Sequence, residues 1–328
     1  MNTVESVLDP DQPIIDAHHH LYIRPSIHYL PEDFASDVQC GHNIQATVFV
    51  QARGFYREQG PKQLQPIGET EFAARVAENF KTVAGPKLCA AIVGFADLLQ
   101  GDAVRAVLEA HMTAGKGHFR GIRHILAWDS DPQFLNPAYS TSEDMMELAA
   151  FKQGFAHLTP LGLSFDAWLL FPQIPRLVSL ARSFPETRIV LNHCGGVLGI
   201  GRYAENRQEF FALWRKYMAE LASCPNISVK LGGLGMAISG FGFNQSLREP
   251  SSEELVNAWR PWIHTCLELF GPKRCMFESN FPADKSSYSY LHGWNAMKIL
   301  AQGLSAAERH AAFYGSAAEF YRLDQPSL

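Results

Sequence analysis

Short apolar runs recur along the chain and alternate with longer stretches of helical periodicity. The runs carry Val, Ile and Leu at consecutive positions, which is typical of strands whose two faces are both buried in a parallel sheet. We predict eight such strands, at residues 13–21, 44–52, 87–97, 119–126, 163–170, 188–196, 227–235 and 275–282.

The stretches between these runs predict amphipathic helices. The last of them, 305–323, begins at Ser305 with Glu308 three residues later, the signature of a capping box. The segment 31–43 shows only a weak helical pattern and is predicted to be little more than a turn. The other predicted helices are 67–84, 101–116, 141–158, 173–184, 203–223, 252–270 and 290–302.

Eight strands that alternate with helices specify an α/β fold, the (β/α)₈ TIM barrel, here with a closing C-terminal helix. Loop lengths support this prediction, because the links from helix to strand are short and those from strand to helix are long. A barrel of this kind places its site on the loops that follow the strands. We expect residues 1–328 to form one domain.

Composition narrows the class of protein. The chain is 47% hydrophobic and 19% charged, with a formal net charge of −5, which favours a globular protein and gives no reason to expect nucleic acid or a membrane as partner. The six cysteines are scattered, which is typical of reduced thiols in a cytoplasmic protein. We expect a cytoplasmic enzyme with a small-molecule substrate, and the sequence leaves a homo-oligomer open.

The first strand ends in three consecutive histidines. Side chains alternate along a strand, so Asp16, His18 and His20 are expected to face the barrel interior. Two imidazoles two positions apart can converge on one divalent metal ion, for which zinc is well suited. His19 is therefore not expected to be a ligand. The set expected to face the helices is Ile15, Ala17, His19 and Leu21.

Two further strands end in residues suited to the same site. On the sixth strand, alternation places His193 on the face of Ile189, at the height of the site. On the fourth strand we predict that Arg123, rather than His124, faces the interior, because Gly121 on the same face leaves room for a long side chain. A buried arginine in this position needs a carboxylate from the protein or from a substrate.

The eighth strand offers a carboxylate, Glu278, and an amide, Asn280, on its interior face. A carboxylate inside a barrel must be paired or protonated. Lys230 on the neighbouring strand is the expected partner of Glu278, and a structural ion pair is favoured over a catalytic role for both residues.

Four sequence elements together resemble the amidohydrolase superfamily, in particular its lactonase branch, over residues 12–323. They are D-x-H-x-H on the first strand, RGIRH on the fourth, NHCGG on the sixth and SNFP on the eighth. The resemblance implies metal ligands at His18, His20 and His193 and a site arginine at Arg123.

The chain departs from this family at two places. Asn280 stands where most members carry an aspartate that takes a proton from the attacking water, and an amide cannot act as that base. The fifth strand has no histidine and offers Asp166 and Trp168 instead. Some lactonases of this branch use histidines and arginines without a metal, so the resemblance is compatible with either mechanism.

We therefore predict a hydrolase that acts on a small, carboxylated lactone or related cyclic ester. A metal at His18 and His20, or Arg123, would polarise the carbonyl. The base could be His193, Asp284 or Glu278, and Asn280 would donate a hydrogen bond to water or substrate. Two alternatives stay open: a metal-dependent decarboxylase of an aromatic or dienoic acid, and a barrel that binds a small acid without turnover. The expected substrate contacts are Arg123, Trp128, Trp168 and Lys230.

Overall fold

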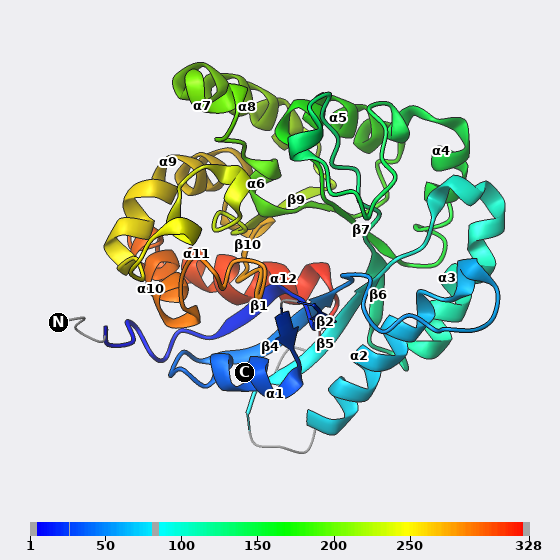
Figure 1. The fold of residues 1–328 in the computed structure, drawn as a ribbon, viewed down its shortest axis with the longest axis horizontal. Coiled ribbons are helices and arrows are strands. Elements are labelled where there is room, and N and C mark those ends of the chain that lie inside the picture. Colours follow the sequence, from blue (N-terminus) through cyan, green and yellow to red (C-terminus); the bar gives the residue numbers. More distant parts are fainter. Residues whose placement is uncertain (1–4, 26, 81–84, 324–328) are drawn as a thin grey trace.

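The computed structural model describes residues 5–25, 27–80 and 85–323, and its centre is a ring of eight parallel strands (Figure 1). The ring closes where the His20 backbone N–H donates to the Phe281 carbonyl (2.7 Å) and the Asn280 N–H donates to the His18 carbonyl (2.9 Å). The strands, in their order around the ring, are β1 Ile14–His19, β4 Ile44–Val50, β5 Lys87–Gly94, β6 Phe119–Ile122, β7 Ser164–Ala167, β8 Ile189–Leu191, β9 Ile227–Leu231 and β10 Cys275–Phe277. The predicted TIM barrel is confirmed.

Helices surround the ring, and a small antiparallel hairpin of β2 (Tyr22–Arg24) and β3 (Ile27–Tyr29) follows β1 (Figure 1). The hairpin was not predicted. The helices are α1 Pro31–Val38, α2 Ile67–Phe80, α3 Val104–Ala114, α4 Ala149–Phe155, α5 Ile174–Ser183, α6 His193–Gly196, α7 Arg202–Glu205, α8 Arg207–Ala222, α9 Ser252–Phe270, α10 Tyr290–Leu300, α11 Ala306–His310 and α12 Ser316–Phe320.

The predicted helix positions agree with the structure in most places. The predicted helix 252–270 coincides with α9, and the capping box at Ser305 is present, since its hydroxyl accepts from the Glu308 N–H. The closing helix is interrupted by a π-helical turn at Ala311–Gly315, so it comprises α11, that turn and α12. The weak segment 31–43 contains α1, which Pro31 begins. Residues 81–84 of the predicted helix 67–84 lie outside the described residues.

Two apolar clusters fill the fold. The larger lies between the strands and the surrounding helices and contains Phe34, Phe49 and Trp214. The smaller lies inside the ring, where residues of β1, β4, β5, β8 and β10 meet Ala318 and Tyr321 of the C-terminal segment. Within the described part of the chain, no helix is both long and apolar enough to span a bilayer. The apolar end of the ring is thus closed by its own C-terminal helix, which leaves the opposite end for a site.

Candidate active site at the C-terminal end of the barrel

His18 and His20 lie inside the barrel, but regular alternation does not put them there. The pairing of β1 with β4 is irregular between Asp16 and His19, which marks a β-bulge. Ile15 on the near side of the bulge belongs to the interior cluster, together with Ala17. Asp16 instead accepts hydrogen bonds from the Ser279 hydroxyl (2.6 Å) and from Tyr290 of α10 (3.0 Å).

The predicted faces of Ile15, Ala17 and Asp16 were therefore wrong, whereas those of the histidines are confirmed. The bulge inserts one extra residue and so restores the histidines to the interior. His19 points outward, stacks on Phe34 with 4.0 Å between ring centroids, and meets the Thr47 hydroxyl at 3.0 Å.

His193 reaches the interior through a backbone turn rather than through alternation. Ile189 and Leu191 of β8 belong to the outer cluster, so the predicted shared face with Ile189 was wrong. His193 and Cys194 have φ values of 55° and 50°, in the left-handed region that side chains other than glycine rarely adopt. This turn aims the imidazole across the ring, where a Cβ added to Gly233 would lie 2.4 Å from it.

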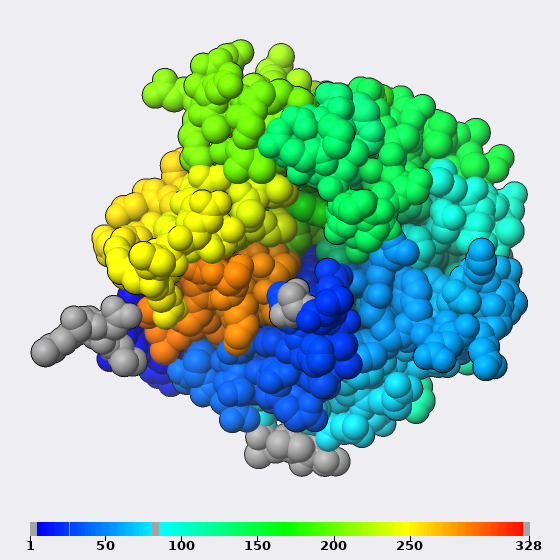
Figure 2. All heavy atoms as spheres, viewed as in Figure 1, coloured from blue at the N-terminus to red at the C-terminus, as the bar shows by residue number. Residues whose placement is uncertain are grey.

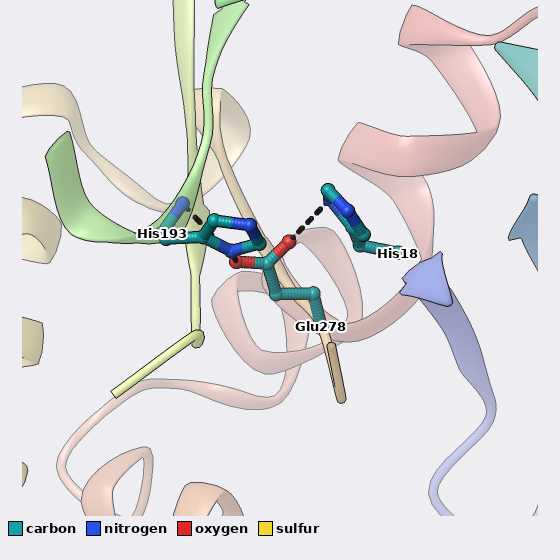
Figure 3. Close-up of side chains that lie close together, drawn as sticks. All are labelled: His18, His193 and Glu278. Carbon is teal, nitrogen blue, oxygen red and sulfur yellow. Dashed lines mark hydrogen bonds and ion pairs between the residues drawn. The ribbon is translucent and has the colours of Figure 1, made fainter. Parts of the chain in front are cut away.

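Glu278 contacts two of these imidazoles at once (Figure 3). Its Oε1 accepts from His193 Nδ1 at 2.6 Å and from the His193 backbone N–H at 3.2 Å, and its Oε2 lies 3.0 Å from His18 Nδ1. Burial raises the pKa of Glu278 to about 8 although Lys230 acts in the opposite direction. The predicted pairing of Glu278 with Lys230 was wrong, because the histidines occupy both carboxylate oxygens.

Lys230 pairs instead with Asp166, at 2.7 Å, and both side chains are completely buried. Asp166 also accepts from the Tyr321 hydroxyl (3.0 Å) and from Asn192 Nδ2 (3.1 Å). The ammonium of Lys230 lies 3.2 Å from His18 Nδ1. This ion pair therefore contacts His18 from the side of the barrel interior on which Tyr321 lies. Asp166 was noticed in the sequence but not recognised as the lysine's partner, although it shares an interior face with Trp168.

Arg123 faces the interior as predicted, and His124 turns to the other face, against Phe95 and Phe151. Arg123 Nη1 lies 3.2 Å from His18 Nε2, and Nη2 donates to the Gln51 carbonyl. Its Nε has no hydrogen-bond partner within the part of the chain that the structure describes. Gln51 was missed, although a polar residue at the end of the apolar run 44–52 is the signal that could have found it.

Two tryptophans were predicted to contact substrate. The Trp168 ring meets His193 edge to face, with 4.7 Å between centroids, so it belongs to this cluster. Trp128 is half-buried and its backbone N–H donates to Gln173 Oε1 at 2.9 Å. Its role as a substrate contact stays a prediction.

The remaining candidates, Asn280 and Asp284, contact each other. Asn280 Nδ2 donates to Asp284 Oδ1 at 2.8 Å, and Asp284 has no exposed surface. Burial raises the pKa of Asp284 to about 7. Because Asp284 is buried and bonded to Asn280, it could act on a substrate only through Asn280.

The donor set fits a divalent metal ion. Burial lowers the pKa of His18, His20 and His193 well below the usual value, so the imidazoles are neutral, which is the form that binds metal. His20 Nδ1 donates to the Val50 carbonyl at 2.7 Å, which leaves a lone pair on Nε2. That atom lies 3.2 Å from His18 Nε2, close to the separation of about 3.3 Å between two nitrogen ligands of one tetrahedral zinc ion.

The structure changes the predicted ligand set in one respect. Ligand atoms of His18, His193 and Glu278 all lie within 4.8 Å of one another, so Glu278 joins two of the three predicted histidines. The charged side chains of Arg123 and Lys230 also contact this cluster, at His18. The arrangement can thus hold a metal, and it can also polarise a carbonyl with the guanidinium.

Comparison with known proteins shows the family to which the chain belongs. The family model described as amidohydrolase matches residues 15–323, so the chain belongs to the amidohydrolase family and is a hydrolase. The resemblance read from the four sequence elements is confirmed.

Individual relatives span almost the whole chain. An uncharacterised protein, y4mH, from Sinorhizobium fredii is 32% identical over 95% of this chain and 99% of its own length. An L-fucono-1,5-lactonase from Burkholderia ambifaria is 27% identical over 83% of this chain and 88% of its own. A solved amidohydrolase with bound zinc from Burkholderia multivorans superposes with a TM-score of 0.73 at 24% identity, over 95% of this chain and 99% of its own. The last likeness concerns the fold.

Proposed function

We propose that this protein hydrolyses a small, carboxylated lactone at the C-terminal end of its barrel. The observation that carries the proposal is the Glu278 carboxylate, which holds His193 by its Nδ1 beside a guanidinium that has no carboxylate partner among the described residues. The lactonase relative supports the choice of an ester over an amide.

His193 is the proposed base. Its Nδ1–H donates to Glu278 Oε1, which leaves the Nε2 lone pair free to take a proton from water as the water oxygen attacks the lactone carbonyl. The imidazolium that forms lies against the carboxylate, which stabilises the positive charge. When the carbon–oxygen bond of the ring breaks, the same proton passes to the leaving alkoxide, and the product is an open-chain hydroxy acid.

Arg123 is proposed to bind the oxygens of the substrate. A guanidinium carries five N–H donors, and only Nη1 and Nη2 have protein contacts among the described residues. The free Nε–H can therefore donate to a substrate carboxylate or to the developing oxyanion, in a site with little water to screen the charge. Trp168, which covers one edge of His193, would limit the access of further water.

A divalent metal would be held by His18 and His20, which leaves the His193 Nε2 lone pair free, and when bound it would supply a Lewis acid and lower the pKa of a coordinated water. The substrate-facing roles of Arg123 and the proton transfer at His193 are proposed for this chain's own residues.

The test is hydrolysis of a panel of lactones, neutral and carboxylated, by protein whose metal content has been measured. Ring opening with a preference for carboxylated members is expected. Arg123→Lys keeps the charge but loses the forked geometry, so binding of carboxylated lactones should weaken by roughly 1–3 kcal/mol. His264→Gln, on an exposed part of α9, is the matched control for His193→Gln. Release of CO₂ from aromatic acids without lactone hydrolysis would contradict the proposal and favour a decarboxylase.

A further inference from the structure

Asn280 contacts the backbone of His18, and of the two polar atoms of its side-chain amide only the nitrogen has a hydrogen-bond partner among the described residues. Its backbone N–H donates to the His18 carbonyl at 2.9 Å, and its φ of 55° places it in the left-handed region. The side chain is 1% exposed, and Nδ2 donates to Asp284 Oδ1 at 2.8 Å. Its Oδ1 has no hydrogen-bond partner in the described ranges 5–25, 27–80 and 85–323. A buried acceptor left open in this way indicates that something outside the protein donates to it.

Asp284 fixes which way this amide points. Its Oδ2 accepts from the Gly235 N–H at 2.9 Å and from the Tyr288 hydroxyl at 2.8 Å, while Oδ1 accepts from Asn280. The ring of Tyr288 is held in turn by Trp259, with 5.0 Å between centroids. In its ionised form the Asp284 carboxylate can only accept hydrogen bonds, so the nitrogen of the Asn280 amide faces it. Since the oxygen and nitrogen of an amide lie on opposite sides of Cγ, Asn280 Oδ1 turns away from Asp284.

We propose that Asn280 Oδ1 accepts a hydrogen bond from the attacking water, and that Asp284 is the positioning residue that keeps this oxygen in place. The inference rests on the proposed lactone hydrolysis. A water that donates one proton to His193 Nε2 and the other to Asn280 Oδ1 has a lone pair left to attack the carbonyl. The proton at His193 is transferred and the one at Asn280 stays on the water oxygen.

The amide supplies orientation, the imidazole supplies basicity, and the carboxylate four residues further on holds the amide. The expectation that Asn280 donates to water or substrate stays a prediction for its second N–H group, because the first donates to Asp284.

The experiment is a cycle of four proteins that exchanges the two side chains. Asn280→Asp places two carboxylates in contact, and Asp284→Asn lets the Asn280 amide rotate so that its N–H groups face the water. We expect each single variant to lose at least about tenfold in kcat with KM changed by less than about threefold. The exchange Asn280→Asp with Asp284→Asn restores one carboxylate, one amide and an acceptor oxygen facing the site. Its kcat should therefore exceed that of both single variants.

The control for a charge-removing change at a buried aspartate is Asp129→Asn. Asp129 also accepts from a tyrosine hydroxyl, Tyr203, at 2.8 Å, and it has an arginine partner, Arg202. Its kcat should equal that of the parent protein. If the loss of kcat in the exchange variant equals the product of the losses in the two single variants, the proposal is overturned.

A second readout does not depend on activity, so failure of the lactone assay stays distinguishable from failure of this inference. In the amide nitrogen–proton NMR spectrum, the Asn280 side-chain signal is identified by its loss in Asn280→Asp. One of its protons should be protected from solvent exchange in the parent protein and unprotected in Asp284→Asn. An Asn280 amide that exchanges equally fast in both proteins would contradict the orientation proposed for it. If the parent opens no lactone, the proposed function fails while this test still decides the role of Asp284.

Discussion

At the N-terminal end of the barrel interior, Ile15, Val48 and Met276 lie against Tyr321 of the C-terminal segment, whereas at the other end the interior is lined by His18 and His193. Both ends are buried, and both are built from the same strands. The apolar end forms a cluster in which each side chain contacts others of its kind. The polar end contains three neutral imidazoles, a guanidinium and a carboxylate, which are expensive to bury.

The difference is clearest in the polar atoms that lack a partner. Gln51 Oε1, Arg123 Nε and Asn280 Oδ1 are all buried without a hydrogen bond to any described residue, and all lie at the polar end. At the boundary between the two ends, the ion pair of Lys230 and Asp166 satisfies its groups through Tyr321 and Asn192. On the face shown in Figure 2 the surface is hollowed near its centre, where the blue, green and orange parts of the chain meet. One end is thus arranged for stability, and the other keeps donors and acceptors for a ligand.

Apart from the loss of Glu278 itself, the largest effect is expected from Gly233→Ala. A Cβ at this position would lie 2.4 Å from the His193 ring, and the residue has a φ of +66°. Displacement of the imidazole should lower kcat by roughly 10²-fold. Gly242→Ala is the matched control, because it has a φ of +75° and no atom within 4 Å of the added Cβ. Equal kcat values for the two variants would show that the position of His193 does not matter for turnover.

The apolar end should respond in stability rather than in activity. Met276→Ala removes a fully buried side chain from the interior cluster and should lower the free energy of unfolding by roughly 2–5 kcal/mol. Urea unfolding measures this loss, and kcat measured well below the melting temperature should stay within about threefold of the parent value. A kcat that fell in parallel with stability would mean that the two ends are not separable.

A smaller effect concerns the pH dependence of stability. Glu69 is buried, its Oε1 accepts from the Ala52 and Gly54 N–H groups at 2.7 and 2.9 Å, and burial raises its pKa to about 7 from the usual 4.5. The folded protein therefore binds a proton that the unfolded chain has lost between about pH 4.5 and 7, so this residue makes stability fall as pH rises through that interval.

Glu69→Gln should remove that part of the pH dependence, roughly 2–3 kcal/mol between pH 5 and 8, as measured by urea unfolding at the two values. Glu109→Gln, an exposed change on α3, should leave the dependence as it is in the parent protein. If the free energy of unfolding of Glu69→Gln changes with pH as much as that of the parent protein, the buried carboxyl does not titrate in this range.

Much of the fold could be predicted because buried parallel strands have a strong and regular apolar signal. The eight strands, the helix 252–270 and the cap of α11 at Ser305 all follow from short-range patterns. The interior position of Arg123 also followed from local sequence, since Gly121 beneath it provides space. Local patterns were sufficient wherever the backbone is regular.

The site was less predictable because its backbone is irregular. The bulge at Asp16–His19 and the left-handed φ of His193 each break the two-residue alternation on which the facing of side chains was predicted. The partner of Glu278 could not be chosen from strand adjacency alone, because Lys230 had a second carboxylate, Asp166, within reach on the interior face. A choice between two carboxylates depends on distances that the sequence does not contain.

The central claim is that Glu278 acts with His193 in catalysis rather than as a structural partner of Lys230. The direct measurement is kcat of Glu278→Gln on the best lactone of the panel, taken together with its free energy of unfolding at pH 8. The amide oxygen can still accept from the His193 Nδ1–H and backbone N–H, so the imidazole stays in place while the negative charge is lost. The account predicts a loss in kcat of roughly 10²- to 10⁴-fold and no loss of stability, because the buried carboxylate is itself unfavourable at that pH. A variant with parental kcat and markedly lower stability would contradict it.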